Sequence, residues 1–257
     1  DGKCPLAGVM PSVTILTLGS AEIPAAQVVA TIPLNVVGDG VRREPEQVAF
    51  AADNDTVAVT LQDTHELLVF SVAELLSLEL ETIEADSSAL KISRLPNRSS
   101  GAEPWPDGLT AFQDGAGTDY FVTAGEYNDT FTIFDLEGTM VQHVEIMPED
   151  MPSDLPRNIE SWSQAPFRPD SVSAFQFDDH PYLAFSLKHA GAVGVWSVDD
   201  LSDIRLVSVV KVGRDDGGTS VTESTIGTEG ISAHSGGFIL TANEDESSVS
   251  VVGPLAP

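Results

Sequence analysis

Four acidic residues recur along the chain at an even spacing. They are Glu46, Asp107, Asp170 and Glu229, and successive members are 61, 63 and 59 residues apart. Each precedes a short apolar run, so each is expected to begin the same kind of strand. Carboxylate oxygens are the ligands of Ca²⁺, which takes six to eight of them. The spacing therefore predicts a calcium-binding ring of carboxylates, and the alternative is that each carboxylate only accepts hydrogen bonds from the backbone of a turn.

A second, weaker set of candidate ligands lies in the turns after the second strands. Its members are Glu126, Asp129 and Glu244. Other chemistry is sparse, because the five histidines are scattered and no pair has metal-ligand spacing. The chain also contains no G-x-S-x-G nucleophile elbow and no P-loop lysine. We therefore expect no catalytic residues and no organic cofactor.

The even period predicts a repeat architecture. In the second copy, alternating residues predict four short strands separated by Gly, Asn and Asp, at 109–112, 120–124, 130–135 and 140–146. Four antiparallel strands repeated at a fixed period are typical of a β-propeller blade. The expected units lie near residues 46–103, 107–166, 170–226 and 229–253. Long connections of about 15 to 20 residues precede the first strands of the later units, and we expect them on one face of the ring.

Two further strands are predicted at 12–18 and 27–34, before the first acidic motif. The last unit contains only three strands, so residues 12–34 are expected to close the ring as an N-terminal strand pair. Residues 1–257 would then form a single all-β domain, a β-propeller with about four four-stranded blades. Two plus three strands make one more than a blade holds, and the alternative is a ring that continues into another polypeptide.

Three stretches of the chain resemble successive blades of a known family. They read PDGLTAFQDGAGTDYFVTAGEYNDTFTIFDLEG, PDSVSAFQFDDHPYLAFSLKHAGAVGVWSVDDLSDIRLVSVVKVG and GTEGISAHSGGFILTANEDESSVSVV. The resemblance, over roughly residues 12 to 253, is to the choice-of-anchor I propeller family, which includes mesenchyme-specific cell-surface glycoproteins. It implies an extracellular or surface-anchored propeller without an established catalytic set. Members of that family are commonly longer, so the resemblance also implies a shortened ring or one piece of a larger one.

The charge of the chain restricts its partners. Forty acidic and 12 basic side chains give a formal net charge of −28. Nucleic-acid binding needs clustered Lys and Arg, so nucleic acid is excluded as a partner. A surface of this charge attracts cations and basic proteins, although it also keeps a protein soluble at high ionic strength. No apolar run is long enough to span a membrane.

The single cysteine and three glycosylation motifs bear on compartment and partners. Cys4 has no second cysteine in the chain, so we expect it to be free or to form an intermolecular disulfide. N-x-S/T motifs begin at Asn54, Asn97 and Asn128, each in a predicted turn or loop. They predict glycosylation, and with it an extracellular or cell-surface location.

Together these patterns predict a non-enzymatic, secreted or cell-surface propeller that serves in binding or extracellular assembly, with calcium. Its expected partners are other extracellular proteins or copies of itself. One alternative is a metal-dependent propeller hydrolase of the lactonase or phytase kind, whose acidic channel would hold the metal. The other is a structural subunit of an extracellular polymer.

Overall fold

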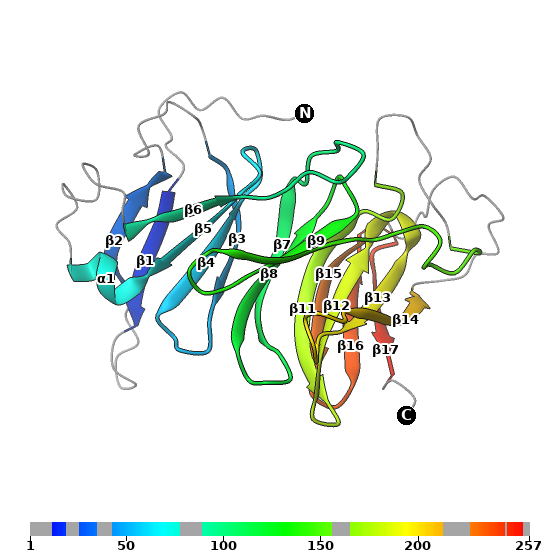
Figure 1. Cartoon of the computed structure of the whole chain (residues 1–257). Helices are drawn as coiled ribbons and strands as arrows, with labels where there is room; N and C mark the ends of the chain where they lie inside the picture. The colour runs from blue at the N-terminus through cyan, green and yellow to red at the C-terminus, as the bar shows by residue number, and fades with distance from the viewer. Residues whose placement is uncertain are drawn as a thin grey trace.

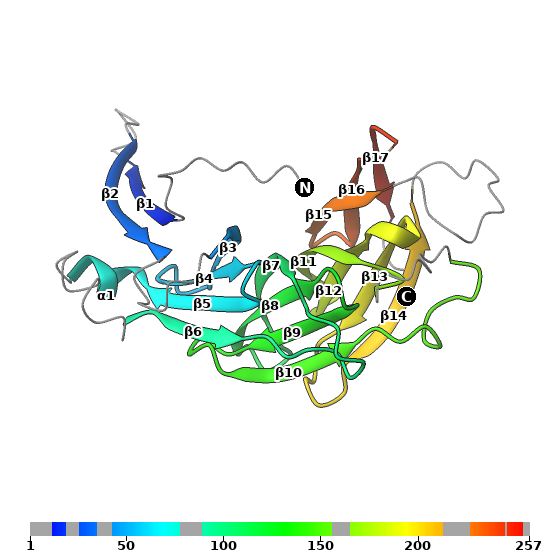
Figure 2. The same cartoon turned by 90° about the horizontal axis from the view of Figure 1, so that it is seen from above.

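The computed structural model of the chain describes residues 12–18, 26–34, 43–77, 89–155, 165–212, 227–244 and 246–253. Its regular secondary structure is almost entirely β-strand, arranged as successive twisted sheets that follow one another along an arc (Figures 1 and 2). The predicted all-β propeller class is confirmed. None of the helices in the described part is long and apolar enough to cross a membrane.

The first three units are four-stranded antiparallel sheets and the fourth is three-stranded, each in sequence order. The first unit consists of β3 (Pro45–Phe50), β4 (Thr56–Leu61), β5 (Glu66–Ser71) and β6 (Lys91–Arg94), with α1 (Val72–Ser77) after β5. The second consists of β7 (Pro106–Gln113), β8 (Asp119–Gly125), β9 (Thr130–Phe134) and β10 (Met140–Glu145). The third consists of β11 (Pro169–Phe177), β12 (His180–Leu187), β13 (Ala192–Ser197) and β14 (Arg205–Lys211), with a 3-10 turn at Lys188–Ala190. The fourth consists of β15 (Thr228–His234), β16 (Phe238–Asn243) and β17 (Ser248–Val252).

The middle strands of the second and third units are buried on both faces, because each sheet is packed between two others. Every residue of β9 and of β13 is buried. The largest cluster of buried apolar residues joins the second and third units, where the Phe131 ring stacks on Phe185 with centroids 4.8 Å apart. Trp196 meets Phe131 and Phe185 edge to face. Aromatic pairs of this kind add about 0.5–1.5 kcal/mol each to the free energy of burial.

The first strands of successive units lie side by side, β3 against β7, β7 against β11 and β11 against β15. Hydroxyl groups of second strands help to hold them together. Thr60 donates a hydrogen bond to the Asp107 carbonyl oxygen at 3.1 Å, and Ser186 donates one to the Glu229 carbonyl oxygen at 2.7 Å. The acceptors are backbone atoms of two of the repeated acidic residues. These hydrogen bonds therefore help to fix the backbone position of Asp107 and Glu229.

The N-terminal strands β1 (Ser12–Leu18) and β2 (Ala26–Pro33) pair with each other. Ile32 and Leu34 pack on Val57, Phe70 and other apolar residues of the first unit. The closing pair predicted from residues 12–34 is not joined to the last unit among the described residues, since β1–β2 and β15–β17 are separate sheets at opposite ends of the arc (Figure 2). The physical reason is the apolar face of β2, which is buried on the first unit instead.

Candidate functional site

Each repeated acidic residue lies in a register irregularity at the start of a first strand. The pairing with the second strand shifts between Pro45 and Val48, Pro106 and Leu109, Pro169 and Val172, and Thr228 and Ile231. A β-bulge re-aims a side chain and is common beside functional sites. The four predicted residues therefore share the same local backbone irregularity. It interrupts the regular alternation of side chains along the strand at each carboxylate.

Three carboxylates meet where the second and third units join. Oxygen atoms of Asp107, Glu126 and Asp170 all lie within 4.8 Å of one another. Asp107 and Asp170 come from adjacent first strands, and Glu126 comes from the turn after β8. Only 4% of Glu126 and 9% of Asp170 is exposed to solvent. We call these three residues the carboxylate cluster.

Glu126 already has a cationic partner. The Arg168 guanidinium donates two hydrogen bonds to Glu126 Oε1, the one from Nε being 2.8 Å long. Arg168 also lies over the Tyr127 ring, 4.8 Å from its centroid, and donates to the Tyr127 hydroxyl oxygen at 3.1 Å. Arg168 has a positive φ of 54°, as does the repeat-equivalent Trp105 with 46°. Such backbone conformations cost about 1–3 kcal/mol and are concentrated at functional sites.

Asp107 and Asp170 have no such partner. Within the described ranges, neither side chain accepts a hydrogen bond or forms an ion pair at salt-bridge distance. A carboxylate as buried as Asp170 is costly to leave without one. The cluster therefore has two carboxylates whose oxygens are available to a ligand.

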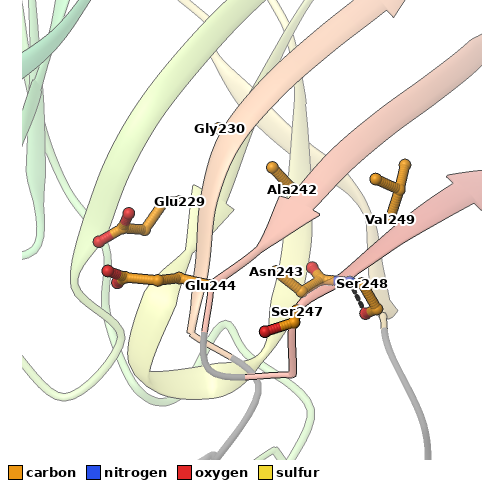
Figure 3. Close-up of a pocket in the computed structure, with 8 residues that line it drawn as sticks. All are labelled: Glu229, Gly230, Ala242, Asn243, Glu244, Ser247, Ser248 and Val249. Carbon is orange, nitrogen blue, oxygen red and sulfur yellow. Dashed lines mark hydrogen bonds between the residues drawn. The ribbon is translucent and has the colours of Figure 1, made fainter.

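Lys188 neutralises a different pair of acids. Its ammonium group forms an ion pair with Glu229 and lies 3.4 Å from Glu244 Oε2. The side chains of Glu229 and Glu244 extend in the same direction from neighbouring strands (Figure 3). Of the predicted metal ligands, Glu229 is thus held by an ion pair rather than grouped with the cluster.

Burial and mutual repulsion make the cluster hard to ionise. Burial, followed by the charges of Asp107 and Glu126, raises the pKa of Asp170 to about 7. Burial, followed by the charges of Glu126 and Glu46, raises the pKa of Asp107 to about 6. The positive charges of Lys188 and Arg168 oppose both shifts without cancelling them. A cation or a proton bound at these groups would therefore relieve the repulsion between them.

The remaining predicted ligands lie outside the cluster. Glu46 is exposed, and its pKa is raised mainly by burial of part of the side chain and by the charges of Glu44 and Glu126. Asp129 is fully buried and accepts hydrogen bonds from the backbone N–H groups of Phe167 and Arg168, at 3.2 and 2.7 Å. Asp129 thus links the turn between β8 and β9 to the segment that precedes β11, and we call it the internal tie. The structure brings Asp107 and Asp170 together, adds Glu126 from the weaker set, and leaves Glu46 nearby.

The glycosylation motifs differ in accessibility. Asn54 and Asn97 are exposed. Asn128 is fully buried, and its amide donates to the Ala102 carbonyl oxygen at 3.3 Å and accepts from the Thr130 hydroxyl at 2.7 Å. A glycan on the Asn128 amide nitrogen would not fit at a fully buried position, so that motif is better explained as a buried turn. Cys4 lies outside the described residues.

A pH prediction follows from the raised pKa values. Both acids take up protons more readily in the folded chain than at the ordinary value of 3.8. Their contribution to stability is therefore present at low pH and is lost as pH rises through about 6 to 7. We expect Asp170→Asn to lose less thermal stability than the unaltered chain between about pH 5 and pH 8 without divalent cations. The measurement is the melting temperature of each protein as a function of pH. An equal decrease in both proteins over this pH range would contradict the prediction.

Sequence reasoning did not find the two cations of this region. Arg168 directly precedes the Pro169–Asp170 pair, and Lys188 follows β12 at the place that Glu126 occupies after β8. The equivalence of Lys188 and Glu126 could have been found by aligning the repeats. The contact of Arg168 with Glu126 could not, because it joins residues of different units.

Comparisons with known proteins agree with the fold and leave the family open. No protein-family model matches the chain, and no curated protein matches it. Solved structures do. They include a periplasmic gluconolactonase from Pseudomonas aeruginosa, with 15% identity, a TM-score of 0.58, and 93% of this chain aligned to 58% of that chain. A protein from Lactobacillus plantarum has 13% identity and a TM-score of 0.59, over 93% of this chain and 60% of that chain.

A third similar structure is the β-propeller domain of Cps50 (Swd1) from Myceliophteria thermophila. It has 9% identity and a TM-score of 0.53, over 96% of this chain and 64% of that chain. The chain thus spans less than two thirds of the length of each of these three structures. At such low identities the likeness shows a β-propeller fold alone.

Proposed function

We propose that this protein is a β-propeller that binds a divalent cation, Ca²⁺ in the first place, at Asp107, Glu126 and Asp170. The observation that carries the proposal is Asp170, nine-tenths buried and without a hydrogen bond among the described residues, within 4.8 Å of two further carboxylates. Asp107 and Asp170 supply two to four of the oxygens that Ca²⁺ requires, the Glu126 oxygen that Arg168 does not hold supplies one more, and water supplies the others. The cation removes the repulsion that otherwise raises their pKa values.

We further propose that the cation serves binding or assembly outside the cell. The exposed motifs at Asn54 and Asn97 and the net charge of −28 support an extracellular location. The resemblance to choice-of-anchor I propellers is consistent with the same setting. Mass spectrometry of glycosidase-treated native material would test that part of the proposal.

Calcium is expected to raise the melting temperature of the chain. A ligand that binds only the folded state adds about 2.7 kcal/mol when its free concentration is a hundred times its dissociation constant. Differential scanning calorimetry in millimolar calcium chloride should show the increase, and sodium chloride of equal ionic strength should not. Asp170→Asn is expected to abolish the calcium-specific part.

Asp178→Asn provides a matched control for this experiment. Asp178 is an exposed acid in the turn at the other end of the same strand, with φ of 55°, which Asn tolerates as well as Asp. It should keep the full calcium effect. Equal effects of calcium and sodium, or an intact calcium effect in Asp170→Asn, would overturn the cation site.

A second candidate function is hydrolysis of a lactone or related ester. The observation that favours it is an acid with a pKa near 7, Asp170, close to the positive charges of Arg168 and Lys188. A general base works best when its pKa is near the working pH, and the cations would stabilise the oxyanion. A gluconolactone hydrolysis assay with the unaltered chain and Asp170→Asn, with and without calcium, separates this function from cation binding alone.

A further inference from the structure

A second pocket lies at the other end of the first strands. It has a volume of about 310 Å³ and is lined by the ends of β3, β7 and β11 that are opposite to the repeated acidic residues. These ends lead into the turns that join first strands to second strands, at the lower edge of the arc in Figure 1. Asp107 and Gln113 lie near the two ends of β7, so at about 3.3 Å per residue the pocket is roughly 20 Å from the carboxylate cluster. The pocket is therefore separate from the proposed cation site.

The hollow results from side chains of unequal size at one repeated position. Phe50, Ala111 and Ala174 each lie two residues after the point at which regular pairing resumes in their first strand, and all three line the pocket. The pair Ala-Phe recurs in these strands, but in the first unit it is offset by one position. Phe50 therefore takes the position at which the other two units have a methyl group, and 57% of it is exposed. The pocket thus combines free space with an accessible aromatic ring.

Two aromatic pairs support the other walls of the pocket. The ring centroids of Phe112 and Tyr120 are 5.6 Å apart, and those of Phe175 and Tyr182 are 5.5 Å apart. Phe112 and Phe175 line the pocket but belong to the buried clusters between units, and each is only 7% exposed. Because these rings are packed from behind, the walls are in place without a ligand.

The turn between β7 and β8 is fixed against the third unit. The Gly115 N–H group donates to the Asp199 carbonyl oxygen at 3.2 Å, and a Cβ atom at Gly115 would lie 2.6 Å from that oxygen. Gln113 and Asp119 pair across the base of this turn, and both line the pocket. Their backbone positions are therefore fixed, which lowers the entropic cost of binding a ligand.

Three polar side chains line the pocket, those of Gln113, Asp119 and Gln176. Within the described ranges, none of these side chains forms a hydrogen bond or an ion pair. Each carboxamide can both donate and accept hydrogen bonds, and the Asp119 carboxylate accepts them. The described residues that line the pocket include no Lys, Arg or His. The polar atoms of the pocket are therefore available to a ligand that is not an anion.

These features select a neutral polar ligand with one apolar face. An anion would meet the charge of Asp119 and the net charge of −28 with no cation in the pocket to hold it. A wholly apolar ligand would remove the Asp119 carboxylate from water without a hydrogen bond in return. A sugar ring has an apolar face of C–H groups, which can lie on an aromatic ring, and a rim of hydroxyl groups that both donate and accept.

We propose that this pocket binds a neutral saccharide, with one sugar ring against Phe50 and its hydroxyl groups hydrogen-bonded to Gln113, Asp119 and Gln176. The volume of about 310 Å³ is at the lower end of the range for small-molecule sites, which is about 300–1,000 Å³. The lining of aromatic and small apolar side chains with a few polar groups is also typical of such sites. Binding does not depend on the cation site at Asp107 and Asp170.

Saturation-transfer NMR with glucose, galactose, mannose, fucose and N-acetylglucosamine tests the proposal. At least one of these sugars should receive saturation from the unaltered chain, to the same extent in calcium chloride and in EDTA. Titration of that sugar then gives its dissociation constant. Phe50→Ala removes the ring and Gln113→Ala removes a hydrogen-bonding group, so each should weaken binding by about tenfold.

Gln142→Ala is the matched control, because Gln142 lies on β10, which contributes no described residue to the pocket. It should bind the sugar with an unchanged dissociation constant. Phe50 and Gln113 are exposed, so both pocket variants should keep the fold, and circular dichroism checks this.

Four results would overturn the proposal. The first is that none of these sugars binds, and the second is that both pocket variants bind as tightly as Gln142→Ala. The third is binding that disappears in EDTA, which would assign the sugar to the cation site instead. The fourth is saturation of choline in place of the sugars, which would show a site for an organic cation on the aromatic rings.

Discussion

Gly108→Ala is expected to destabilise the chain by about 3 kcal/mol, the upper end of what an added buried carbon usually costs. The added Cβ atom would lie 2.6 Å from the Asp170 carbonyl oxygen, 2.8 Å from Ser171 Cα and 2.9 Å from the Val172 nitrogen. All three are backbone atoms, so no change of side-chain rotamer relieves the overlap. The third unit must move away from the second, and the large contact between them must open.

Urea unfolding measures this effect. The urea concentration at the midpoint should decrease, while the dependence of the unfolding free energy on urea concentration stays the same. Gly230→Ala is the matched control, because it makes the same change at the equivalent place, where only the Ala242 side chain lies within 4 Å. Its free energy of unfolding should stay within about 0.5 kcal/mol of the unaltered chain. Equal midpoints for Gly108→Ala and Gly230→Ala would show that the second and third units are not in close contact.

Asp129→Asn is expected to cost about 3 kcal/mol. The carboxylate accepts hydrogen bonds from two backbone N–H groups, and the Arg98 guanidinium lies 3.6 Å from it. An amide keeps the shape and the φ preference of the residue and can still accept from both N–H groups through Oδ1, but its NH₂ group replaces Oδ2 and faces the Arg98 guanidinium. Because the position is completely buried, water cannot replace the lost acceptor.

Glu145→Gln tests the other side of the same arginine. Glu145 lies 3.4 Å from Arg98 Nε, with about a fifth of its side chain exposed. Glu145 also accepts hydrogen bonds from the backbone N–H and the hydroxyl of Ser99, at 2.7 and 2.8 Å, and water reaches this part-exposed site, so the change should cost about 1 kcal/mol. Calorimetric melting of both variants checks the contrast, and a larger effect for Glu145→Gln than for Asp129→Asn would contradict the role of Asp129 as the internal tie.

Local patterns predicted the units because the features that define them are local. Alternation and turn residues located β17 at Ser248–Val252 and β1 at Ser12–Leu18 with their observed bounds. The acidic residue before each apolar run correctly indicated the start of a first strand. Repetition at one spacing then implied that these starts lie near one another, which holds for Asp107 and Asp170.

The parts that were not predicted depend on contacts between units. The ion pair of Arg168 with Glu126 joins residues 42 positions apart, and no periodic pattern specifies it. The packing of β1–β2 on the first unit was not predicted for a related reason, since an alternating apolar strand fits any apolar face. Its burial on the first unit rather than the last is decided by the shape and packing of that face.

The open arc also determines the order in which the chain loses structure. Its main contacts between units run between neighbours, so its stability is approximately a sum of terms for each unit and each junction, as in a linear array. The second and third units have a junction on both sides, and the first has β1–β2 on its outer side. Among the described residues the last unit has one junction, with the third unit, and Val249 and Val251 on its outer face are exposed. In the 257-residue chain, unfolding should therefore begin at β15–β17 and proceed toward the second and third units.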